Sequence, residues 1–246
     1  MIYSNKSNFE DVKVATILPA KNESLCIGEL IDKLNDYVNQ VIVIDGNSSD
    51  KTTEIAKSHG AEIFTAEGKG KGHDLRLFQR HVQKNSTQID IFVMLDADMS
   101  YSPEEIENIT RPIKSNNADV VIGSRFDILK PEPGSTRSFN KFGNFLLTRM
   151  ARFLYQNTDI TDITSGYWAF SKKFLMNAPL SAEGWDLETD LFNTAIRNYR
   201  FKIVPIIYRR RIGYSKCSVL YAYRFPVYLS KYFALGQLKN SLSFKT

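Results

Sequence analysis

The stretch IDIFVMLDADMSYSP, residues 89–103, decides how the chain is expected to fold. Ile91 to Leu95 is a short apolar run, which is typical of a strand buried on both faces of a parallel sheet. The run ends at Asp96-Ala97-Asp98, and side chains at positions i and i+2 of an extended chain share a face. Both carboxylates are therefore expected at the carboxyl end of the strand, the edge at which open α/β sheets bind ligands.

The pair formed by Asp96 and Asp98 predicts a metal site. Two carboxylates this close repel each other unless a cation lies between them. Hard divalent ions with oxygen ligands, Mg²⁺ or Mn²⁺, fit such a pair and usually bring a phosphate group with them. An alternative stays open at this point: a solvated strand end followed by a helix cap, because Ser102-Pro103-Glu104-Glu105 is a good helix start.

Composition and hydropathy narrow the class of protein. The chain has 246 residues, of which 43% are hydrophobic and 24% charged, as in an ordinary globular protein. This length allows one large α/β domain or one domain plus an appendage. No apolar run approaches the roughly 20 residues that a membrane-spanning helix needs. Residues 1–12 also lack the apolar core of a signal peptide, so a cytoplasmic protein is predicted. Cys26 and Cys217 form neither a metal-ligand spacing nor a disulfide framework.

Apolar strands alternate with helices along the first 125 residues. Strands are expected at 12–18, 40–44, 61–65, 91–95 and 120–123, and helices near 25–34, 51–58 and 73–84. This alternation predicts an α/β fold with a doubly wound, mostly parallel sheet and helices on both faces. Asp45 follows the second strand, so it should share one sheet edge with Asp96 and Asp98, where a nucleotide would sit. Helix capping explains each turn alone, but it explains the alignment of all three less well.

Four segments together resemble family 2 glycosyltransferases, which have the GT-A fold. Their order and spacing match that family: Ile17-Leu18-Pro19-Ala20-Lys21-Asn22-Glu23, the turn from Asp45 to Thr52, Lys69-Gly70-Lys71-Gly72, and Asp96-Ala97-Asp98. The match covers roughly residues 12–216. It implies a nucleotide-sugar donor and a divalent ion, Mg²⁺ or Mn²⁺, held by Asp96 and Asp98.

The resemblance also assigns residues to the donor. It implies that base and ribose are held by the turn containing Pro19, Ala20, Asn22 and Glu23, together with Asp45. Lys71 would lie near the base or the diphosphate, and Arg125 is also placed on the donor side. Ile44 departs from the family, since many relatives have a second acidic residue there. The choice among GDP-mannose, UDP-glucose and UDP-N-acetylhexosamines therefore stays open.

Two later segments resemble the polyprenyl-phosphate sugar synthases within the family. Residues 162–170 carry their Asp-x-x-Ser-Gly-aromatic pattern, and residues 211–216 match the Arg-x-Gly-x-Ser-Lys segment of the dolichyl-phosphate mannose and glucose synthases. The resemblance implies a polyprenyl or dolichyl phosphate acceptor, bound by Asp162, Ser165, Arg211, Ser215 and Lys216. Guanidinium and ammonium groups bind phosphate oxygens well, although a basic run is more commonly a solvated face.

Trp185 to Asp190 opens a helix that is expected to run to about Asn198. Its acidic residues suit a helix N-terminus, so a capping role is one interpretation. The resemblance places Asp186 and Glu188 near the acceptor. A phosphate acceptor, with its second pKa near 6, is already largely a nucleophile at neutral pH, whereas a hydroxyl needs a base such as Asp186 or Glu188. An ion on Asp98 would neutralise the leaving group, and direct attack should invert the anomeric carbon.

The remaining segments suggest contact with a membrane surface. The helix expected at 138–155 places Phe139, Phe142, Leu146, Met150, Phe153 and Leu154 on one face, for packing in the core or on a membrane. Residues 218–246 combine aromatic and basic side chains, which tolerate the bilayer interface. We expect a disordered tail at 1–11, a GT-A domain at 12–217 and an amphipathic segment at 218–246. The predicted location is peripheral, on the cytoplasmic membrane face.

Three other functions are compatible with parts of the sequence. A family 2 transferase could use a soluble or lipid-linked hydroxyl acceptor instead. A nucleotidyltransferase would need a glycine-rich, Arg-containing loop directly after the first strand, and residues 19–23 are not one. An RNA-binding module would explain the basic residues near 209–216, but aligned carboxylates repel phosphate without a metal. No nucleic-acid partner is therefore predicted, and the oligomeric state stays open.

Overall fold

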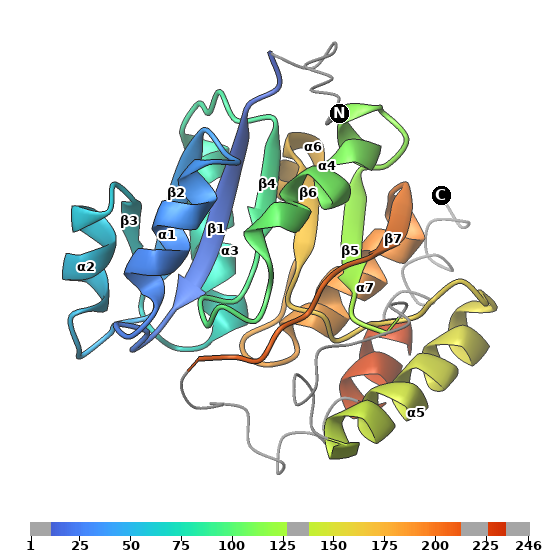
Figure 1. Cartoon of the computed structure of the whole chain (residues 1–246). Helices are drawn as coiled ribbons and strands as arrows, with labels where there is room; N and C mark the ends of the chain where they lie inside the picture. The colour runs from blue at the N-terminus through green and yellow to red at the C-terminus, as the bar shows by residue number, and fades with distance from the viewer. Residues whose placement is uncertain (1–10, 127–137, 213–225, 235–246) are drawn as a thin grey trace, which may run out of the picture.

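The computed structural model describes residues 11–126, 138–212 and 226–234 (Figure 1). Within them lies a seven-stranded sheet in the order β3-β2-β1-β4-β6-β5-β7. The strands are β1 (Val14–Ala20), β2 (Gln40–Asp45), β3 (Glu62–Thr65), β4 (Ile91–Met94), β5 (Val120–Ser124), β6 (Trp168–Ser171) and β7 (Phe201–Pro205). β6 pairs antiparallel with β4 and β5, and the other pairs are parallel. The predicted α/β fold with a mostly parallel sheet is confirmed.

Helices cover both faces of this sheet (Figure 1). One layer contains α1 (Ile27–Asn35), α2 (Thr52–Ser58) and, after the short 3₁₀ helix Pro103–Glu105, α4 (Ile106–Lys114). The other contains α3 (Lys71–Lys84), α6 (Lys172–Asn177) and α7 (Leu187–Asn198), and α5 (Ser138–Tyr155) adds side chains to the same core. In β1, Ile17 packs into one core and Leu18 into the other, and neither has exposed surface. This burial on both faces explains why the strands are apolar runs.

The direction of the strands gathers the turns at one edge. Parallel strands end at the same edge of a sheet, which is the lower edge in Figure 1. Asp45 ends β2 there, in register with Ala20 at the end of β1. Because β6 runs the opposite way, the residues just before Trp168 reach the same edge beside the end of β4, where Met94 pairs with Trp168. The edge therefore combines turns that are far apart in sequence.

The inner faces of two helices differ from the prediction. Leu25 was expected on the inner face of the first helix, but it precedes α1 and is 80% exposed. In α5, Leu146 and Phe153 are 55% and 83% exposed, whereas Leu147 and Ala151 are buried. The side chains of Phe139 and Phe142 lie outside the described residues.

Polar contacts explain the orientation of α5. Thr164 donates from its hydroxyl to Asn144 Oδ1 at 2.8 Å, and Thr148 donates to the Thr161 carbonyl at 3.4 Å. The helix therefore docks on the turn before β6 through buried polar side chains. A pattern that counts only apolar residues does not detect such a face.

The late segment is helical at residues 226–234, where Leu229 and Tyr232 are buried against the domain. The structure does not describe residues 1–10 of the expected tail, residues 127–137 or the rest of the expected amphipathic segment. None of the described helices combines the length and the hydropathy that a membrane span requires.

Candidate active site

Lys71 joins three elements at the lower edge of the sheet. Its ammonium group, at the start of α3, donates to Asp96 Oδ1 at 2.7 Å and to Glu188 Oε1 at 2.8 Å. Asp96 follows β4, and Glu188 lies in the first turn of α7. Burial alone would raise the pKa of Asp96, but the charge and hydrogen bond of Lys71, with the charges of Arg211 and Arg125, together hold that pKa below its ordinary value. Burial likewise would lower the pKa of Lys71, and the two carboxylates raise it instead.

Asp98 is 2% exposed and is held from two sides. Its Oδ1 accepts the Ser100 N–H at 3.0 Å and the Ser100 hydroxyl at 2.5 Å, while its Oδ2 accepts from the Arg211 guanidinium. Backbone bonds run alongside, from Ile212 N–H to the Asp98 carbonyl at 2.9 Å and from Arg209 N–H to the Ser100 carbonyl at 2.8 Å. The start of the predicted acceptor segment thus lies along the Asp96–Asp98 turn.

The two carboxylates fit a divalent cation. Asp96 keeps 34% of its side chain exposed, so it is open to an ion arriving with a ligand. Asp98 supplies hard oxygen atoms from the same turn, and both carboxylates already face a cationic group, Lys71 or Arg211. Carboxylate oxygens are the ligands that Mg²⁺ and Mn²⁺ prefer. Among the described residues, no third His, Cys, Asp or Glu completes a metal cluster with them.

The turn before β6 packs directly under Asp96. A Cβ atom on Gly166 would lie 2.5 Å from Asp96 Oδ2, so only glycine allows this approach. The turn is also held by its backbone: the Gly166 N–H donates to the hydroxyl of the buried Tyr101 at 2.6 Å. The Ser-Gly-aromatic motif therefore supports the first carboxylate of the predicted metal site.

The turns after β1 and β2, predicted to hold base and ribose, are joined to each other. Asn22 Oδ1 accepts the Ser49 N–H at 2.8 Å, and the Asn22 N–H donates to the Ser48 hydroxyl at 3.0 Å. The Glu23 N–H donates to Thr52 Oγ1 at 2.8 Å. These bonds bring the turn with Pro19 and Ala20 beside that of Asp45.

Asp45 is 4% exposed and accepts the Ser48 N–H at 3.2 Å.

Asp74 supports the same region and is not among the predicted site residues. Its carboxylate, 5% exposed, accepts the Gly68 N–H at 3.1 Å and lies 3.2 Å from where a Cβ on Gly46 would be. It therefore links the glycine-rich loop to the Asp45-Gly46 turn, and burial raises its pKa. The sequence signal that could have identified Asp74 is its position, an acidic residue in the first turn of a helix that follows a glycine-rich loop.

Arg125 and Asp162 were expected on the donor and acceptor sides, and the structure pairs them instead. Arg125 donates from Nε to Asp162 Oδ2 at 2.7 Å and from a terminal nitrogen to Oδ1 at 2.9 Å. Asp162 and Ser165 have no exposed surface, and the Ser165 hydroxyl accepts the Tyr167 N–H at 3.2 Å. Their assignment to the acceptor stays a prediction, since both side chains are buried in this arrangement. The pair fixes the turn before β6 to the end of β5.

Asp186 and Glu188 face different neighbours. Glu188 contacts Lys71, whereas Asp186 accepts the Gly184 N–H at 2.9 Å and the Tyr232 hydroxyl at 2.8 Å. Tyr232 comes from residues 226–234 and was expected only as part of an amphipathic segment. Of the predicted acceptor residues, Arg211 lies in the site as described above. Ser215 and Lys216 lie outside the described residues.

The sequence model described as "Glycosyl transferase family 2" matches residues 16–177. The chain is 31% identical over 217 residues to the dolichyl-phosphate hexose transferase of Haloferax volcanii, covering 85% of this chain and 87% of that protein. It is 31% identical over 201 residues to glycosyltransferase AglJ of the same organism, covering 80% of this chain. The chain spans 63% of the length of AglJ and 48% of the hexosyltransferase Agl6. The polyprenol monophosphomannose synthase of Mycolicibacterium smegmatis is 28% identical, with 84% of this chain and 81% of that protein covered.

Solved structures share the fold at low sequence identity. Glucosyl-3-phosphoglycerate synthase of Mycobacterium tuberculosis, in complex with Mn²⁺, UDP-glucose and phosphoglyceric acid, superposes with a TM-score of 0.70 at 19% identity. The alignment covers 91% of this chain and 80% of that one. Mannosyl-3-phosphoglycerate synthase of Rubrobacter xylanophilus gives a TM-score of 0.69 at 18% identity, covering 94% and 75%. These likenesses confirm the predicted GT-A-like architecture.

Proposed function

We propose, from the premise that this chain belongs to glycosyltransferase family 2, that it transfers a hexose from a nucleotide-sugar to a polyprenyl phosphate. Membership follows from the family match over residues 16–177, and it makes the protein a glycosyltransferase. The observation that carries the acceptor class is the contact of Arg211 with Asp98. It sets a phosphate-binding side chain beside the carboxylates that would hold the donor's metal ion. The relatives named for dolichyl and polyprenyl phosphate support this choice.

The donor half of the proposed site consists of three turns. Asp96 and Asp98 would hold Mg²⁺ or Mn²⁺, which when bound neutralises the charge on the departing nucleoside diphosphate. Asp45 and the turn from Pro19 to Glu23 would hold base and ribose. Lys71 keeps Asp96 and Glu188 from repelling each other and adds positive charge near the diphosphate.

The acceptor half is proposed around Arg211. Its side chain is 36% exposed, while its buried Nε has no hydrogen-bond partner in the described structure. A buried N–H without a partner costs free energy. A phosphate oxygen would accept from the Arg211 Nε–H once the Arg211 side chain turns away from Asp98. Ser215 and Lys216 belong to the same sequence motif and would add to this contact.

The hydrogen-bond partners of the two candidate bases, Asp186 and Glu188, support a phosphate acceptor over a hydroxyl acceptor. Glu188 is engaged by Lys71, and Asp186 accepts hydrogen bonds on both oxygens. In this arrangement both carboxylates are therefore engaged with groups of the domain itself. A phosphate monoester needs no such base, only positioning for in-line attack, which inverts the anomeric carbon.

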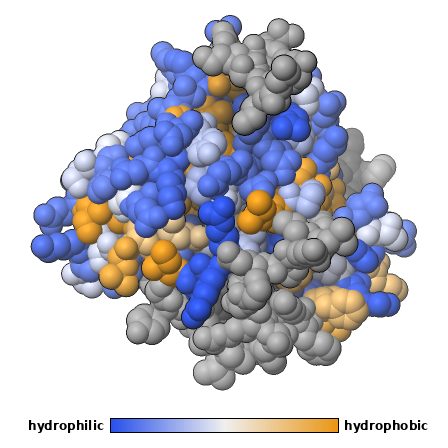
Figure 2. Space-filling model, in the orientation of Figure 1, coloured by the Kyte–Doolittle hydropathy of each residue, from blue (hydrophilic) through white to orange (hydrophobic). Residues whose placement is uncertain are grey.

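A lipid acceptor also needs access to a membrane, and α5 supplies a suitable surface. Phe145, Leu146 and Phe153 are exposed there, beside the exposed Arg149 and Arg152. Figure 2 shows apolar surface at the lower right, where Figure 1 places α5. The Arg149 guanidinium lies 5.6 Å from the centre of the Phe145 ring, so cation and apolar group share one face. Such a face suits the interface of an anionic bilayer, and we propose peripheral binding through it.

A direct test offers the enzyme short-chain polyprenyl phosphate, the matching free alcohol and phosphoglycerate. Each is incubated with Mn²⁺ and GDP-mannose, UDP-glucose or UDP-N-acetylglucosamine, and the products are separated by mass. Glycosylation of the polyprenyl phosphate alone is the expected result. Transfer only to phosphoglycerate would overturn the lipid acceptor while leaving the chain a family 2 transferase.

A further inference from the structure

Residues 226–234 bring a tyrosine to the acceptor side of the proposed site. Leu229 has no exposed surface and Tyr232 is 2% exposed, so this short helix is packed into the domain. The Tyr232 hydroxyl donates to Asp186 Oδ2 at 2.8 Å. A side chain from beyond the last strand of the sheet thus contacts a residue at the start of α7.

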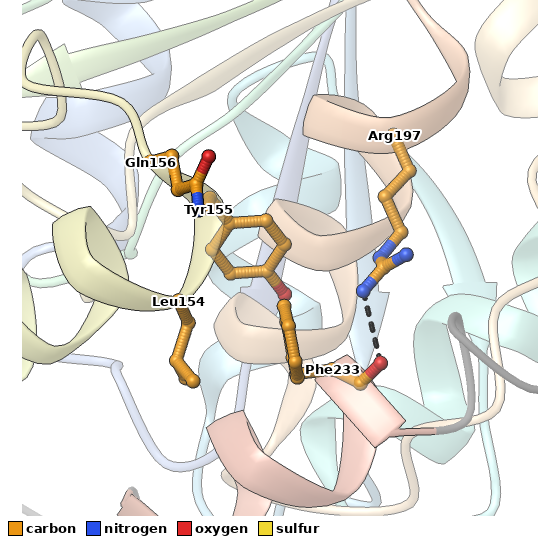
Figure 3. A pocket seen from close by; sticks show the side chains of 5 residues that line it. All are labelled: Leu154, Tyr155, Gln156, Arg197 and Phe233. Atoms are coloured by element: carbon orange, nitrogen blue, oxygen red, sulfur yellow. Dashed lines mark hydrogen bonds between the residues drawn. The ribbon is translucent and has the colours of Figure 1, made fainter.

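The helix is anchored independently of that hydroxyl (Figure 3). Arg197 of α7 donates to the Phe233 carbonyl at 2.9 Å, and a cation at a helix C-terminus is favourable. The same guanidinium lies 5.1 Å from the centre of the Phe233 ring and 5.5 Å from that of Tyr155. These side chains, with Leu154 and Gln156, line a cavity of about 380 Å³. The Phe233 ring and the backbone of the helix are therefore expected to stay in place when only the Tyr232 hydroxyl is removed.

The contact of Tyr232 continues towards the metal site. Asp186 immediately precedes α7, and its other oxygen accepts the Gly184 N–H at 2.9 Å. Two residues later, Glu188 reaches Lys71, which contacts Asp96. The hydroxyl of Tyr232 is thus linked, through the first turn of α7, to the first carboxylate of the Asp96–Asp98 turn.

The surroundings of Tyr232 keep it a hydrogen-bond donor. Burial and the negative charges of Asp190 and Asp186 raise the pKa of its phenol, so it stays protonated at neutral pH. Asp190 is itself buried and accepts the Ser181 and Ala182 N–H groups at 2.6 and 2.8 Å. A neutral donor between two buried carboxylates fixes one of them without adding charge.

We propose that Tyr232 is a positioning residue for glycosyl transfer. By holding Asp186 it fixes the first turn of α7, and with it the Glu188–Lys71–Asp96 arrangement. Residues 226–234, part of the expected amphipathic segment, then contribute a positioning residue to the site as well. This inference rests on the proposed transfer function, because positioning has meaning only for a reaction at this edge.

The test compares Tyr232→Phe with Tyr155→Phe. Tyr155 is a matched control, since its hydroxyl also donates within the domain, to Asn193 Oδ1 at 2.7 Å, without touching the first turn of α7. Both variants keep the ring, and Tyr232→Phe should lower the Tm somewhat more, because its hydroxyl binds a charged carboxylate and that of Tyr155 a neutral amide. Tyr232→Phe should lower kcat by about tenfold to a hundredfold, the loss expected for a hydrogen bond to a charged group. The KM for the nucleotide-sugar should stay within about twofold by the same reasoning, because donor turns remain intact.

A double-mutant cycle identifies the route of the effect. If Tyr232 acts through Asp186, adding Tyr232→Phe to Asp186→Asn should lower kcat far less than it does in the wild type. Equal kcat in Tyr232→Phe and Tyr155→Phe, or losses that multiply fully with Asp186→Asn, would overturn the proposal. If the wild type glycosylates no polyprenyl phosphate, the acceptor assignment fails instead. In that case Tyr232→Phe and Tyr155→Phe are compared by their rates of Mn²⁺-dependent hydrolysis of the nucleotide-sugar.

Discussion

Lys71 and Glu188, which are 117 residues apart in the chain, form an ion pair 2.8 Å long at the lower edge of the sheet. Their side chains are 13% and 9% exposed. The pair connects the glycine-rich loop before α3 to the first turn of α7. Because Lys71 also holds Asp96, one ammonium group sets the distance between the donor turn and the acceptor side.

Replacing Lys71 by Met should affect both stability and activity. It would leave Asp96 and Glu188 facing each other without a cation, which costs up to about 3 kcal/mol because Asp96 is partly exposed. Urea unfolding measures this loss, and transfer should fall with it. Lys69→Met is the control, since Lys69 is 67% exposed and pairs only with Glu67 in the described salt bridges. A Lys71→Met protein as stable and active as that control would contradict the prediction.

The proposed metal site predicts loss of transfer in Asp98→Ala. The Asp98 carboxylate supplies a ligand in a turn held by Ser100, so its removal should lower turnover on the order of a hundredfold or more with the fold retained. Circular dichroism checks the fold. In the wild type, excess EDTA should stop transfer and added Mn²⁺ should restore it. Full activity in EDTA would exclude the metal-dependent mechanism.

Asp45→Ala should weaken binding of nucleoside diphosphate. Asp45 lies at the end of β2 beside the turn of Asn22, where base and ribose are proposed. Loss of a hydrogen bond to a charged group predicts an affinity lower by about tenfold to a hundredfold. Calorimetry with GDP and UDP in the presence of Mn²⁺ measures it, with the exposed Asp36→Ala as control. Unchanged affinity in Asp45→Ala would refute this donor assignment.

Arg211→Ala should impair use of the acceptor far more than binding of the donor. A charge-assisted contact contributes roughly 1.5–3 kcal/mol, or about one to two decades in kcat/KM for polyprenyl phosphate. Arg209→Ala is the control, because Arg209 lies in the same segment and pairs with Glu104 at 3.8 Å. Equal losses in acceptor efficiency and in nucleotide affinity would argue against a phosphate role for Arg211.

The surface of α5 predicts binding to anionic vesicles. Phe153→Ser, at a position that is 83% exposed, should reduce sedimentation with vesicles containing phosphatidylglycerol and leave the Tm unchanged. Salt should release part of the wild type, since exposed charge interactions are screened. Met176→Ser, on α6, serves as a partly buried control away from α5. Identical sedimentation of wild type and Phe153→Ser would exclude this face.

The strand ends could be predicted because they depend on local pattern. The run from Ile91 to Leu95 is apolar on both faces, and strand direction alone then carries Asp45, Asp96 and Asp98 to one edge. By contrast, the pairing of Arg125 with Asp162 depends on β6 lying beside β5. No local pattern contains that information.

Two other features of the structure could not be predicted, for physical reasons of the same kind. The buried face of α5 is set by Asn144 and Thr148, whose partners are in the turn before β6. When a helix has apolar residues on several faces, such polar contacts decide which face is buried. Tyr232 lies in an aromatic, basic segment, a composition that also suits a membrane interface. Only tertiary packing reveals that one of these rings points to Asp186.

The antiparallel strand β6 has a consequence for biosynthesis. β4 and β5 follow each other along the chain, yet β6 lies between them in the sheet. A growing polypeptide that has not yet reached residues 168–171 therefore leaves one side of β4 without a hydrogen-bonding neighbour. Unpaired strand edges promote association between chains, and pairing over such separations is slow. Pausing before residues 168–171 have emerged from the ribosome should expose the nascent protein to aggregation, whereas pausing after residues 201–205 have emerged should not.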